Sequence, residues 1–188
     1  MEIEADGWLS GARRCPSPHC DARPVGTDIE LLVIHGISLP PGEYGGPWID
    51  DLFLGRLDPA AHPAFGPIAG LRVSAHLLIR RDGECVQYVS FDQRAWHAGQ
   101  SSYRGRPACN DFSIGIELEG CDSAPYAPVQ YRALARVVRA LRRRYPAIEE
   151  DAIVGHSDIA PGRKTDPGPA FDWALLRRLL QSPLETAS

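Results

Sequence analysis

Two stretches of the chain arrange apolar residues in the ways that predict β-strands. Residues 29–34 form an almost unbroken aliphatic run that ends at His35, which indicates a central strand buried on both faces. Residues 113–119 alternate instead, with aliphatic side chains on one face and Glu117 and Glu119 on the other. Two carboxylates on one face are unusual in a packed sheet, so this strand is a candidate for chemistry.

Further strands are predicted on either side of a turn signal. Residues 71–79 and 84–89 have strand patterns, and an Asp-Gly dipeptide lies in the turn between them. Asp-Gly between two apolar runs predicts a β-hairpin. Residues 152–154 form a short apolar run that leads directly to His156.

Apolar residues recur at helical spacing in two other segments. Residues 129–145 carry one apolar stripe and end before Pro146, and residues 171–180 form a final amphipathic helix. A shorter helix is predicted at residues 47–54, where proline occupies the first position. The connection of residues 91–110 is long enough to be a binding loop.

Together these patterns predict a mixed α/β fold in which helices flank a central mixed β-sheet. We expect a single domain over residues 1–188, with an irregular arm at residues 1–28 and a frayed tail at residues 182–188. Open sheets usually present their chemistry at the carboxyl ends of the strands. The strand ends are therefore where we expect the site.

Composition narrows the possible functions. The 188 residues include 20 basic and 24 acidic side chains, giving a net charge of −4, so we expect no nucleic-acid partner. No apolar run approaches the length of about 20 residues that spans a bilayer, so we expect no membrane partner either. The five cysteines are scattered and the first residues are acidic, which favours a cytoplasmic protein with reduced thiols. We expect it to be a monomer.

The loop of residues 155–169 holds His156, Lys164 and Asp166 between several glycines and prolines. Together with His35 from the first strand, this loop would supply two imidazoles and one carboxylate, from His156 and Asp166. That is the composition of a catalytic zinc site with one position left for water. Histidines at strand ends that bond only to backbone would explain the same spacing equally well.

A zinc hydrolase also needs a base for the water proton and a positive group at the developing oxyanion. Glu117 is the candidate base, and Lys164 is the candidate for the oxyanion. The alternatives are a surface carboxylate on an edge strand for Glu117 and a charge on the rim of the site for Lys164. From the residues alone, a zinc hydrolase follows as a hypothesis with an undefined substrate.

Several motifs make a family resemblance specific. They are Leu32-Val-Ile-His35, Val73-Ser-Ala-His-Leu-Leu-Ile-Arg-Arg-Asp-Gly83, Ala95-Trp-His-Ala-Gly99, Asn110-Asp-Phe-Ser-Ile-Gly-Ile-Glu-Leu-Glu-Gly120, and Gly155-His156 followed by Lys164-Thr-Asp-Pro-Gly168. Through them the chain resembles the zinc N-acetylmuramoyl-L-alanine amidase family, which includes phage lysozyme-amidases and peptidoglycan recognition proteins. The resemblance runs from about Gly7 to Trp173, and the run at residues 37–48 is similar to a cytosolic branch that acts on 1,6-anhydro-muropeptides.

This resemblance implies that His35, His156 and Asp166 bind one zinc ion per chain. It also implies that Glu117 activates the water and that Lys164 stabilises the oxyanion. The implied reaction is hydrolysis of the amide between the lactyl group of muramic acid and L-alanine of the stem peptide. The implied setting is cytosolic peptidoglycan recycling, which keeps down the signal that induces β-lactamase.

Four further residues are candidates for substrate binding under the same resemblance. Trp96 and His97 would line the cleft, and Tyr44 and Arg72 would make further contacts. Trp96 packed in the core and Arg72 as a buried strut are the alternatives.

The chain also departs from the family pattern. Relatives usually carry asparagine after the first histidine ligand, where this chain has Gly36, and a basic residue where it has Ala108. These departures bear on substrate affinity and leave the proposed ligands unchanged.

Two rival functions remain open from the sequence. One is a non-catalytic module that binds muropeptides. The other is a cysteine hydrolase that uses Cys109 with His97, although nothing in the sequence indicates an activated thiolate.

Overall fold

The computed structural model describes residues 1–182, so the predicted frayed tail lies outside the described residues except for Ser182. The helices are α1 (Trp48–Phe53), α2 (Pro128–Arg144), α3 (His156–Ile159) and α4 (Trp173–Gln181). The strands are β1 (Arg13–Arg14), β2 (Cys20–Asp21), β3 (Leu31–Ile37), β4 (Leu77–Ile79), β5 (Cys85–Gln87), β6 (Arg94–Ala95), β7 (Ser102–Tyr103), β8 (Arg106–Pro107), β9 (Ser113–Glu119) and β10 (Ile153–Gly155). Short 3-10 helices lie at Cys109–Asp111 and Glu150–Ala152.

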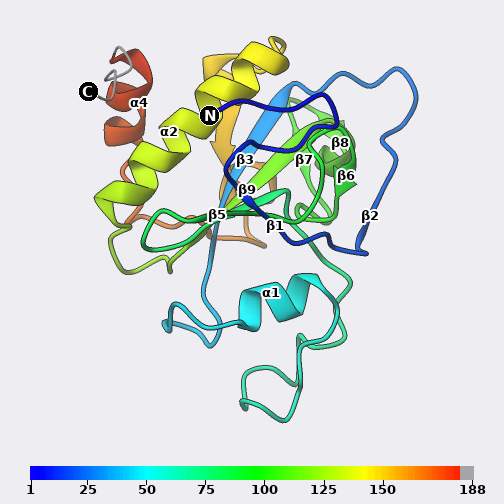
Figure 1. Cartoon of the computed structure of the whole chain (residues 1–188), viewed down its shortest axis with the longest axis vertical. Helices are drawn as coiled ribbons and strands as arrows, with labels where there is room; N and C mark the ends of the chain where they lie inside the picture. Colours follow the sequence, from blue (N-terminus) through cyan, green and yellow to red (C-terminus); the bar gives the residue numbers. More distant parts are fainter. Residues whose placement is uncertain (183–188) are drawn as a thin grey trace.

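A mixed sheet in the order β1-β5-β4-β9-β3-β10 forms the centre of the molecule (Figure 1). Strands β4 and β5 are antiparallel, and the other neighbouring pairs are parallel. The Asp-Gly turn joins β4 to β5, as the hairpin signal predicted, and Gly83 adopts a φ of 88° there. The predicted mixed α/β fold with a central mixed sheet is therefore confirmed.

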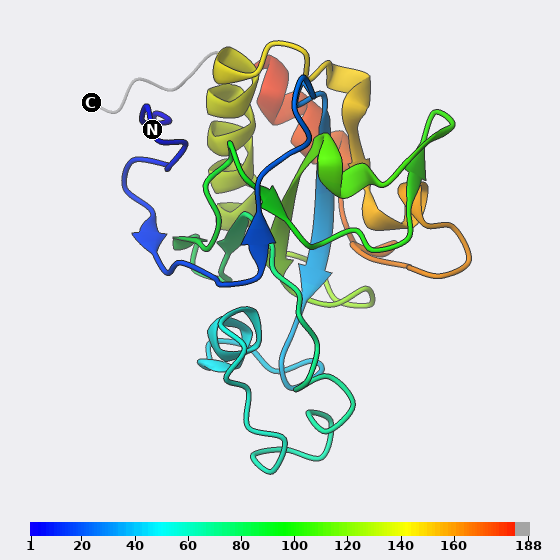
Figure 2. The same cartoon turned by 90° about the vertical axis from the view of Figure 1, so that its right-hand side faces the viewer.

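One face of this sheet is apolar and is covered by helices. Leu32 and Ile34 of β3 pack with the aliphatic residues of β9 against the buried stripe of α2, and α4 lies beside α2 (Figure 2). Gln130 of α2 joins the helix to the sheet, because its amide donates hydrogen bonds to the carbonyls of Ile79 and Glu119. The periodicities of the sequence thus converge on one core.

The opposite face is covered by loops. Leu31 and Val33 of β3 pack there against Ala98, Phe112 and a few other buried residues from the connections that precede β9 and flank β10. Because these connections carry polar residues among the apolar ones, this face can hold a buried site.

A lobe formed by residues 39–75 extends beyond the end of β3 and includes α1 (Figures 1 and 2). Arg80 joins this lobe to the sheet, since its guanidinium contacts Asp50 of α1 at 3.1 Å and Glu119 of β9 at 3.3 Å. Asp50 also accepts a hydrogen bond from Tyr88. These ionic groups are largely buried and are all paired, as buried charges must be.

Some predicted elements have different bounds. Strand β4 starts at Leu77 rather than at residue 71, because the preceding segment bonds to loops; the N–H of Ser74, for example, donates to the carbonyl of Trp96. The arm at residues 1–28 contributes β1 and β2, so it is not wholly irregular. His35 lies two residues before the end of β3 instead of at its end.

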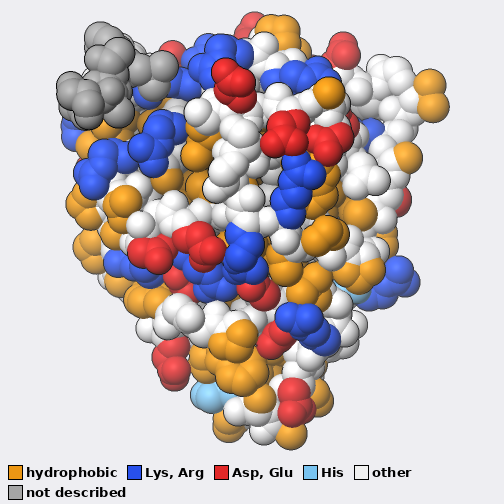
Figure 3. Space-filling view, viewed as in Figure 1, with side chains coloured by type: hydrophobic (Ala, Val, Ile, Leu, Met, Phe, Trp, Pro, Cys, Tyr) orange, Lys and Arg blue, Asp and Glu red, His pale blue; other side chains and the backbone are white. Residues whose placement is uncertain are grey.

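The surface carries no single dominant charge on the side shown in Figure 3, where acidic and basic side chains are interspersed. None of the helices in residues 1–182 has the length and apolar character that a membrane span requires.

Gly36 fits tightly against Tyr126. A Cβ atom at position 36 would lie 2.2 Å from the Tyr126 hydroxyl oxygen, which itself donates a hydrogen bond to the carbonyl of Pro167 at 2.9 Å. The departure at Gly36 therefore has a structural reason, because the tyrosine fills the space that a larger side chain would need.

We expect Gly36→Ala to lower the free energy of unfolding by about 1–3 kcal/mol, the usual cost of overpacking. In a Tyr126→Phe background the nearest remaining ring atom would be 3.4 Å away, so the same substitution should cost less. Urea unfolding of the four proteins measures this coupling. Equal costs in both backgrounds would show that the hydroxyl does not limit the space.

Candidate metal centre

Three side chains converge on the loop-covered face of the sheet. They are His35 of β3, His156 at the start of α3, and Asp166 in the loop that follows α3, and one potential ligand atom of each lies within 4.8 Å of the others. The Nδ1 atoms of the two histidines are 3.0 Å apart. They lie 3.2 and 3.1 Å from Oδ2 of Asp166.

The strand register explains why the two histidines meet. Gly155 of β10 is paired with Ile34 of β3. The residues that follow them, His156 and His35, therefore lie side by side. Asp166 is brought back to them by a hydrogen bond from the N–H of Ser157 to its carbonyl.

The spacing of the three atoms fits a tetrahedral metal ion. In a tetrahedral site, zinc bonds of about 2.0–2.1 Å place neighbouring ligand atoms about 3.3 Å apart. The three distances between the ligand atoms of the cluster are close to this value. The Nε2 atom of His156 faces the carbonyl oxygen of Ala98 at 3.3 Å. Because a carbonyl only accepts, Nε2 carries the proton and Nδ1 directs its lone pair at the cluster. Two imidazoles and one carboxylate are the donor set of an open zinc site.

The electrostatic environment favours the forms that bind a metal. Burial lowers the pKa of His35 to about 4, so its imidazole is neutral near neutral pH. Burial alone would raise the pKa of the Asp166 carboxyl, but the two imidazoles beside it hold that pKa well below its usual range. Neutral imidazole and carboxylate are the states in which these groups act as ligands.

Glu117 lies beside this cluster. It is paired with His35 across the parallel strands β3 and β9, so both side chains project from the same face of the sheet. Glu117 is only 8% exposed, and its Oε2 atom has no hydrogen-bond partner within residues 1–182. Burial and the nearby charge of Asp166 raise its pKa well above the usual value. The alternative of a surface carboxylate on an edge strand is wrong, because β9 lies between β4 and β3.

Lys164 is exposed in the loop between His156 and Asp166. Its positive charge is close enough to oppose the rise in the pKa of Glu117. The preceding residue, Arg163, fixes this loop by donating to the carbonyls of Ala98 at 2.7 Å and Gln100 at 2.6 Å. The backbone next to Lys164 is therefore fixed to the 98–100 segment.

His97 contacts the cluster directly, and its predicted contact with substrate stays a prediction. Its Nδ1 atom lies 2.9 Å from Nε2 of His35, and its Nε2 atom lies 3.1 Å from the hydroxyl of Ser113. The ring thus lies behind a clustered histidine, on the side away from Asp166.

Trp96, Arg72 and Tyr44 lie outside the cluster. Trp96 is half-buried, donates from Nε1 to Asp21 at 3.2 Å, and has the guanidinium of Arg72 5.2 Å from its ring centroid. Tyr44 is exposed, with its hydroxyl 3.5 Å from the sulfur of Cys121 beyond the end of β9. None of them forms a hydrogen bond or ring contact with the three clustered residues in the described chain, so their predicted substrate contacts stay predictions.

The structure gives no support to a cysteine nucleophile. Cys109 is fully buried, and burial raises the pKa of its thiol. Its proposed partner, His97, is bonded to His35 and Ser113 instead. A buried protonated thiol without a base is a poor nucleophile.

Asn110, Arg163 and Tyr126 all contact the loops of the site, and no role for them was predicted from the sequence. Asn110 had one signal, its place in a motif shared with the family. Arg163 and Tyr126 act on backbone carbonyls, and such contacts leave no pattern in a single sequence.

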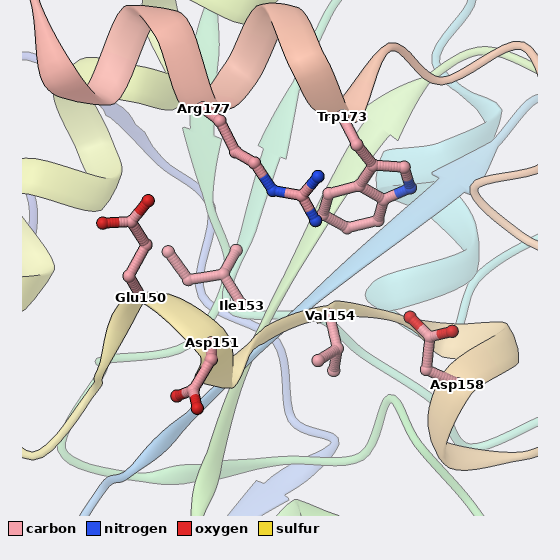
Figure 4. A pocket seen from close by; sticks show the side chains of 7 residues that line it. All are labelled: Glu150, Asp151, Ile153, Val154, Asp158, Trp173 and Arg177. Carbon is pink, nitrogen blue, oxygen red and sulfur yellow. The ribbon is translucent and has the colours of Figure 1, made fainter.

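A cavity of about 590 Å³ lies elsewhere, between β10 and α4 (Figure 4). Its lining residues are Glu150, Asp151, Ile153, Val154, Asp158, Trp173 and Arg177. None of them was predicted for the site. Asp158 has a structural role, since its carboxylate accepts a hydrogen bond from the N–H of Gly155 at 2.7 Å.

Known proteins resemble this chain in both sequence and structure. The model of the N-acetylmuramoyl-L-alanine amidase family matches residues 25–169. The 1,6-anhydro-N-acetylmuramyl-L-alanine amidase AmpD of Escherichia coli (strain K12) is 67% identical over 174 residues, covering 93% of this chain and 94% of that protein.

Two solved structures extend this comparison. The crystal structure of a selenomethionine derivative of AmpD is 64% identical, covers 96% of this chain and 99% of its own, and superposes with a TM-score of 0.93. The amidase AmiD from E. coli was solved in complex with the substrate anhydro-N-acetylmuramic acid-L-Ala-D-γ-Glu-L-Lys. It is 30% identical, covers 94% of this chain and 65% of its own, and has a TM-score of 0.60.

If the three clustered residues hold a metal, His156→Ala should abolish stoichiometric zinc binding, because it removes one of three protein ligands. We expect the parent chain to carry one zinc ion and the variant to carry almost none after dialysis, as measured by atomic absorption. His62, a partly buried histidine in the lobe of residues 39–75, lies outside the cluster and provides the control. His62→Ala should keep its zinc. A full equivalent of zinc in His156→Ala would contradict the ligand set.

Proposed function

The chain belongs to the N-acetylmuramoyl-L-alanine amidase family, and from this premise we propose that His35, His156 and Asp166 hold the zinc ion of its hydrolytic site. The enzyme is an amidase that hydrolyses the bond between 1,6-anhydro-N-acetylmuramic acid and L-alanine of the stem peptide. Its 67% identity to AmpD over nearly the whole of both chains supports this specificity, as does the substrate in the AmiD complex.

One observation carries the mechanistic part of the proposal. Glu117, a buried carboxylate, projects from the strand position paired with His35. Its Oε2 atom accepts no hydrogen bond from residues 1–182, and an unpaired buried polar atom is costly. A catalytic water beside the clustered ligands would give it a partner.

Zinc bound by these ligands would supply Lewis acidity and lower the pKa of a water molecule toward neutrality. Glu117 would accept the proton of the attacking water and then deliver it to the departing amine of L-alanine. Its raised pKa suits this role, since a carboxylate of higher proton affinity is the stronger base. The ammonium group of Lys164 would stabilise the negative charge that develops on the substrate carbonyl oxygen.

A non-catalytic muropeptide-binding module is the weaker alternative. Such a module needs neither a buried base nor an ammonium group beside the ligands, and this chain has both Glu117 and Lys164. Site composition decides function within a shared fold, and here the composition favours catalysis.

We also propose that the enzyme is a monomer and acts in the cytoplasm, in peptidoglycan recycling that limits β-lactamase induction. All five cysteines are free in the structure, which agrees with a reducing compartment. The 1,6-anhydro sugar in the name of its relatives supports the recycling role.

The direct test is product analysis by mass spectrometry with anhydro-muramoyl tripeptide. The zinc-loaded protein should release free tripeptide and anhydro-muramic acid. A strong chelator should abolish the reaction, and added zinc should restore it. Tight binding of the substrate without cleavage would instead support the binding module.

Replacing Glu117 by glutamine tests the base. We expect Glu117→Gln to keep its zinc and to lower kcat by at least about 100-fold, the lower range for loss of a general base. Glu119→Gln is the matched control, because Glu119 is buried two residues further along the same face but is bonded to Arg80. This control should retain most of the activity. Turnover by Glu117→Gln at the parent rate would contradict the assignment of the base.

A further inference from the structure

The two clustered histidines take their outer hydrogen-bond partners from two consecutive residues of one loop. Nε2 of His35 lies 2.9 Å from Nδ1 of His97. Nε2 of His156 lies 3.3 Å from the carbonyl oxygen of Ala98. The dipeptide of residues 97–98 therefore contacts both imidazoles on the sides that face away from the ligand cluster.

These contacts are consistent with one arrangement of protons. The Ala98 carbonyl requires a proton on Nε2 of His156. A proton on Nε2 of His35, donated to Nδ1 of His97, leaves Nδ1 of His35 free for a metal in the same way. His97 then donates from its own Nε2 to the hydroxyl of Ser113 at 3.1 Å. Each clustered imidazole thus presents its Nδ1 lone pair to Asp166 and the metal position.

Asn110 fixes the backbone of this dipeptide. Its side-chain oxygen accepts hydrogen bonds from the N–H groups of His97 at 3.2 Å and Ala98 at 2.8 Å. From the other side, Arg163 donates to the same Ala98 carbonyl that faces His156. The position of both outer partners is therefore set by one amide side chain and one guanidinium.

The sheet leaves space for the His97 ring at this point. A Cβ atom on Gly115 of β9 would lie 2.4 Å from Cγ of His97. The imidazole consequently packs directly on the strand backbone, between Ser113 and His35. The ring nitrogens of His97 are engaged on both sides, by His35 and by Ser113.

We propose that Asn110 and His97 are positioning residues for the zinc centre. Asn110 holds the 97–98 backbone, His97 orients His35 through a side-chain acceptor, and Ala98 orients His156 through its carbonyl. This inference rests on the proposed zinc site and assigns His97 a function other than substrate contact. Partners of this kind set the tautomer and direction of a ligand, and their loss weakens metal affinity by about 10- to 100-fold.

Paired substitutions separate this role from simple packing. His97→Phe keeps an aromatic ring but removes the acceptor, whereas His97→Asn loses the ring but keeps an oxygen near the position of Nδ1. Asn110→Ala removes the oxygen that accepts from both N–H groups, whereas Asn110→Asp retains an acceptor oxygen. If the acceptors matter, the Asn and Asp variants should bind zinc more tightly than the Phe and Ala variants.

Ser101→Ala is the matched control. Ser101 lies in the same loop, is buried, and its hydroxyl bonds to the carbonyl of Gly99 and the N–H of Cys109. Among the described residues its hydroxyl forms no hydrogen bond with His97 or Ala98. Its loss should lower thermal stability while the zinc affinity stays at the parent value.

The measurement is the zinc dissociation constant of the full chain, by competition with a chelating dye, with circular dichroism to verify folding. We expect His97→Phe and Asn110→Ala to bind zinc about 10- to 100-fold more weakly than the parent. Imidazole ¹⁵N spectra of the zinc-loaded parent should show protonated Nε2 atoms for His35 and His156.

Three outcomes would overturn the inference. They are parent-like zinc affinity in His97→Phe and Asn110→Ala, tighter binding by His97→Phe than by His97→Asn, or an equal loss of affinity in Ser101→Ala. If His97→Phe does not fold, the two Asn110 variants decide. A parent chain that takes up no zinc would refute the proposed zinc site itself, which is a different result from unchanged affinity in the variants.

Discussion

The parallel pairing of β3 with β9 is the constraint on which the rest of the site depends. Parallel strands in register direct paired residues to the same side of the sheet, so His35 and Glu117 lie next to each other without any loop to position them. Strand β10 adds His156 from the other side of β3. A shift of one residue in either pairing would turn one of these groups toward α2 and destroy the arrangement.

The two faces of the sheet divide stability from chemistry. The face toward α2 and α4 is mostly apolar, and this burial provides most of the hydrophobic stabilisation. The other face buries histidines and a glutamate under loops, where the low dielectric disfavours their charged forms. The free energy that this burial costs is offset by hydrophobic burial on the apolar face. Burial also yields neutral imidazoles and a strongly basic carboxylate, which are the states that a metal-dependent hydrolase requires.

Residues of the same type perform different tasks within this arrangement. Glu117 and Glu119 lie two positions apart on one face of β9, yet Glu119 accepts hydrogen bonds from Arg80 and from the N–H groups of Gly45 and Arg81. Glu119 thus connects the lobe to the sheet, whereas one oxygen of Glu117 has no hydrogen-bond partner within residues 1–182. Partners, rather than residue type or burial, therefore distinguish the candidate base from the structural carboxylate.

The sequence by itself determined the elements with strong periodicity and predicted which residues would be the metal ligands. The alternation of residues 113–119 specifies a strand, and the shared motifs identified His35, His156 and Asp166 as ligand candidates. It could not give the strand order or show that His97 lies behind His35. Those features come from contacts between residues far apart in the chain, many of them to backbone atoms that every residue possesses. Only the tertiary structure decides such contacts, because no local pattern encodes them.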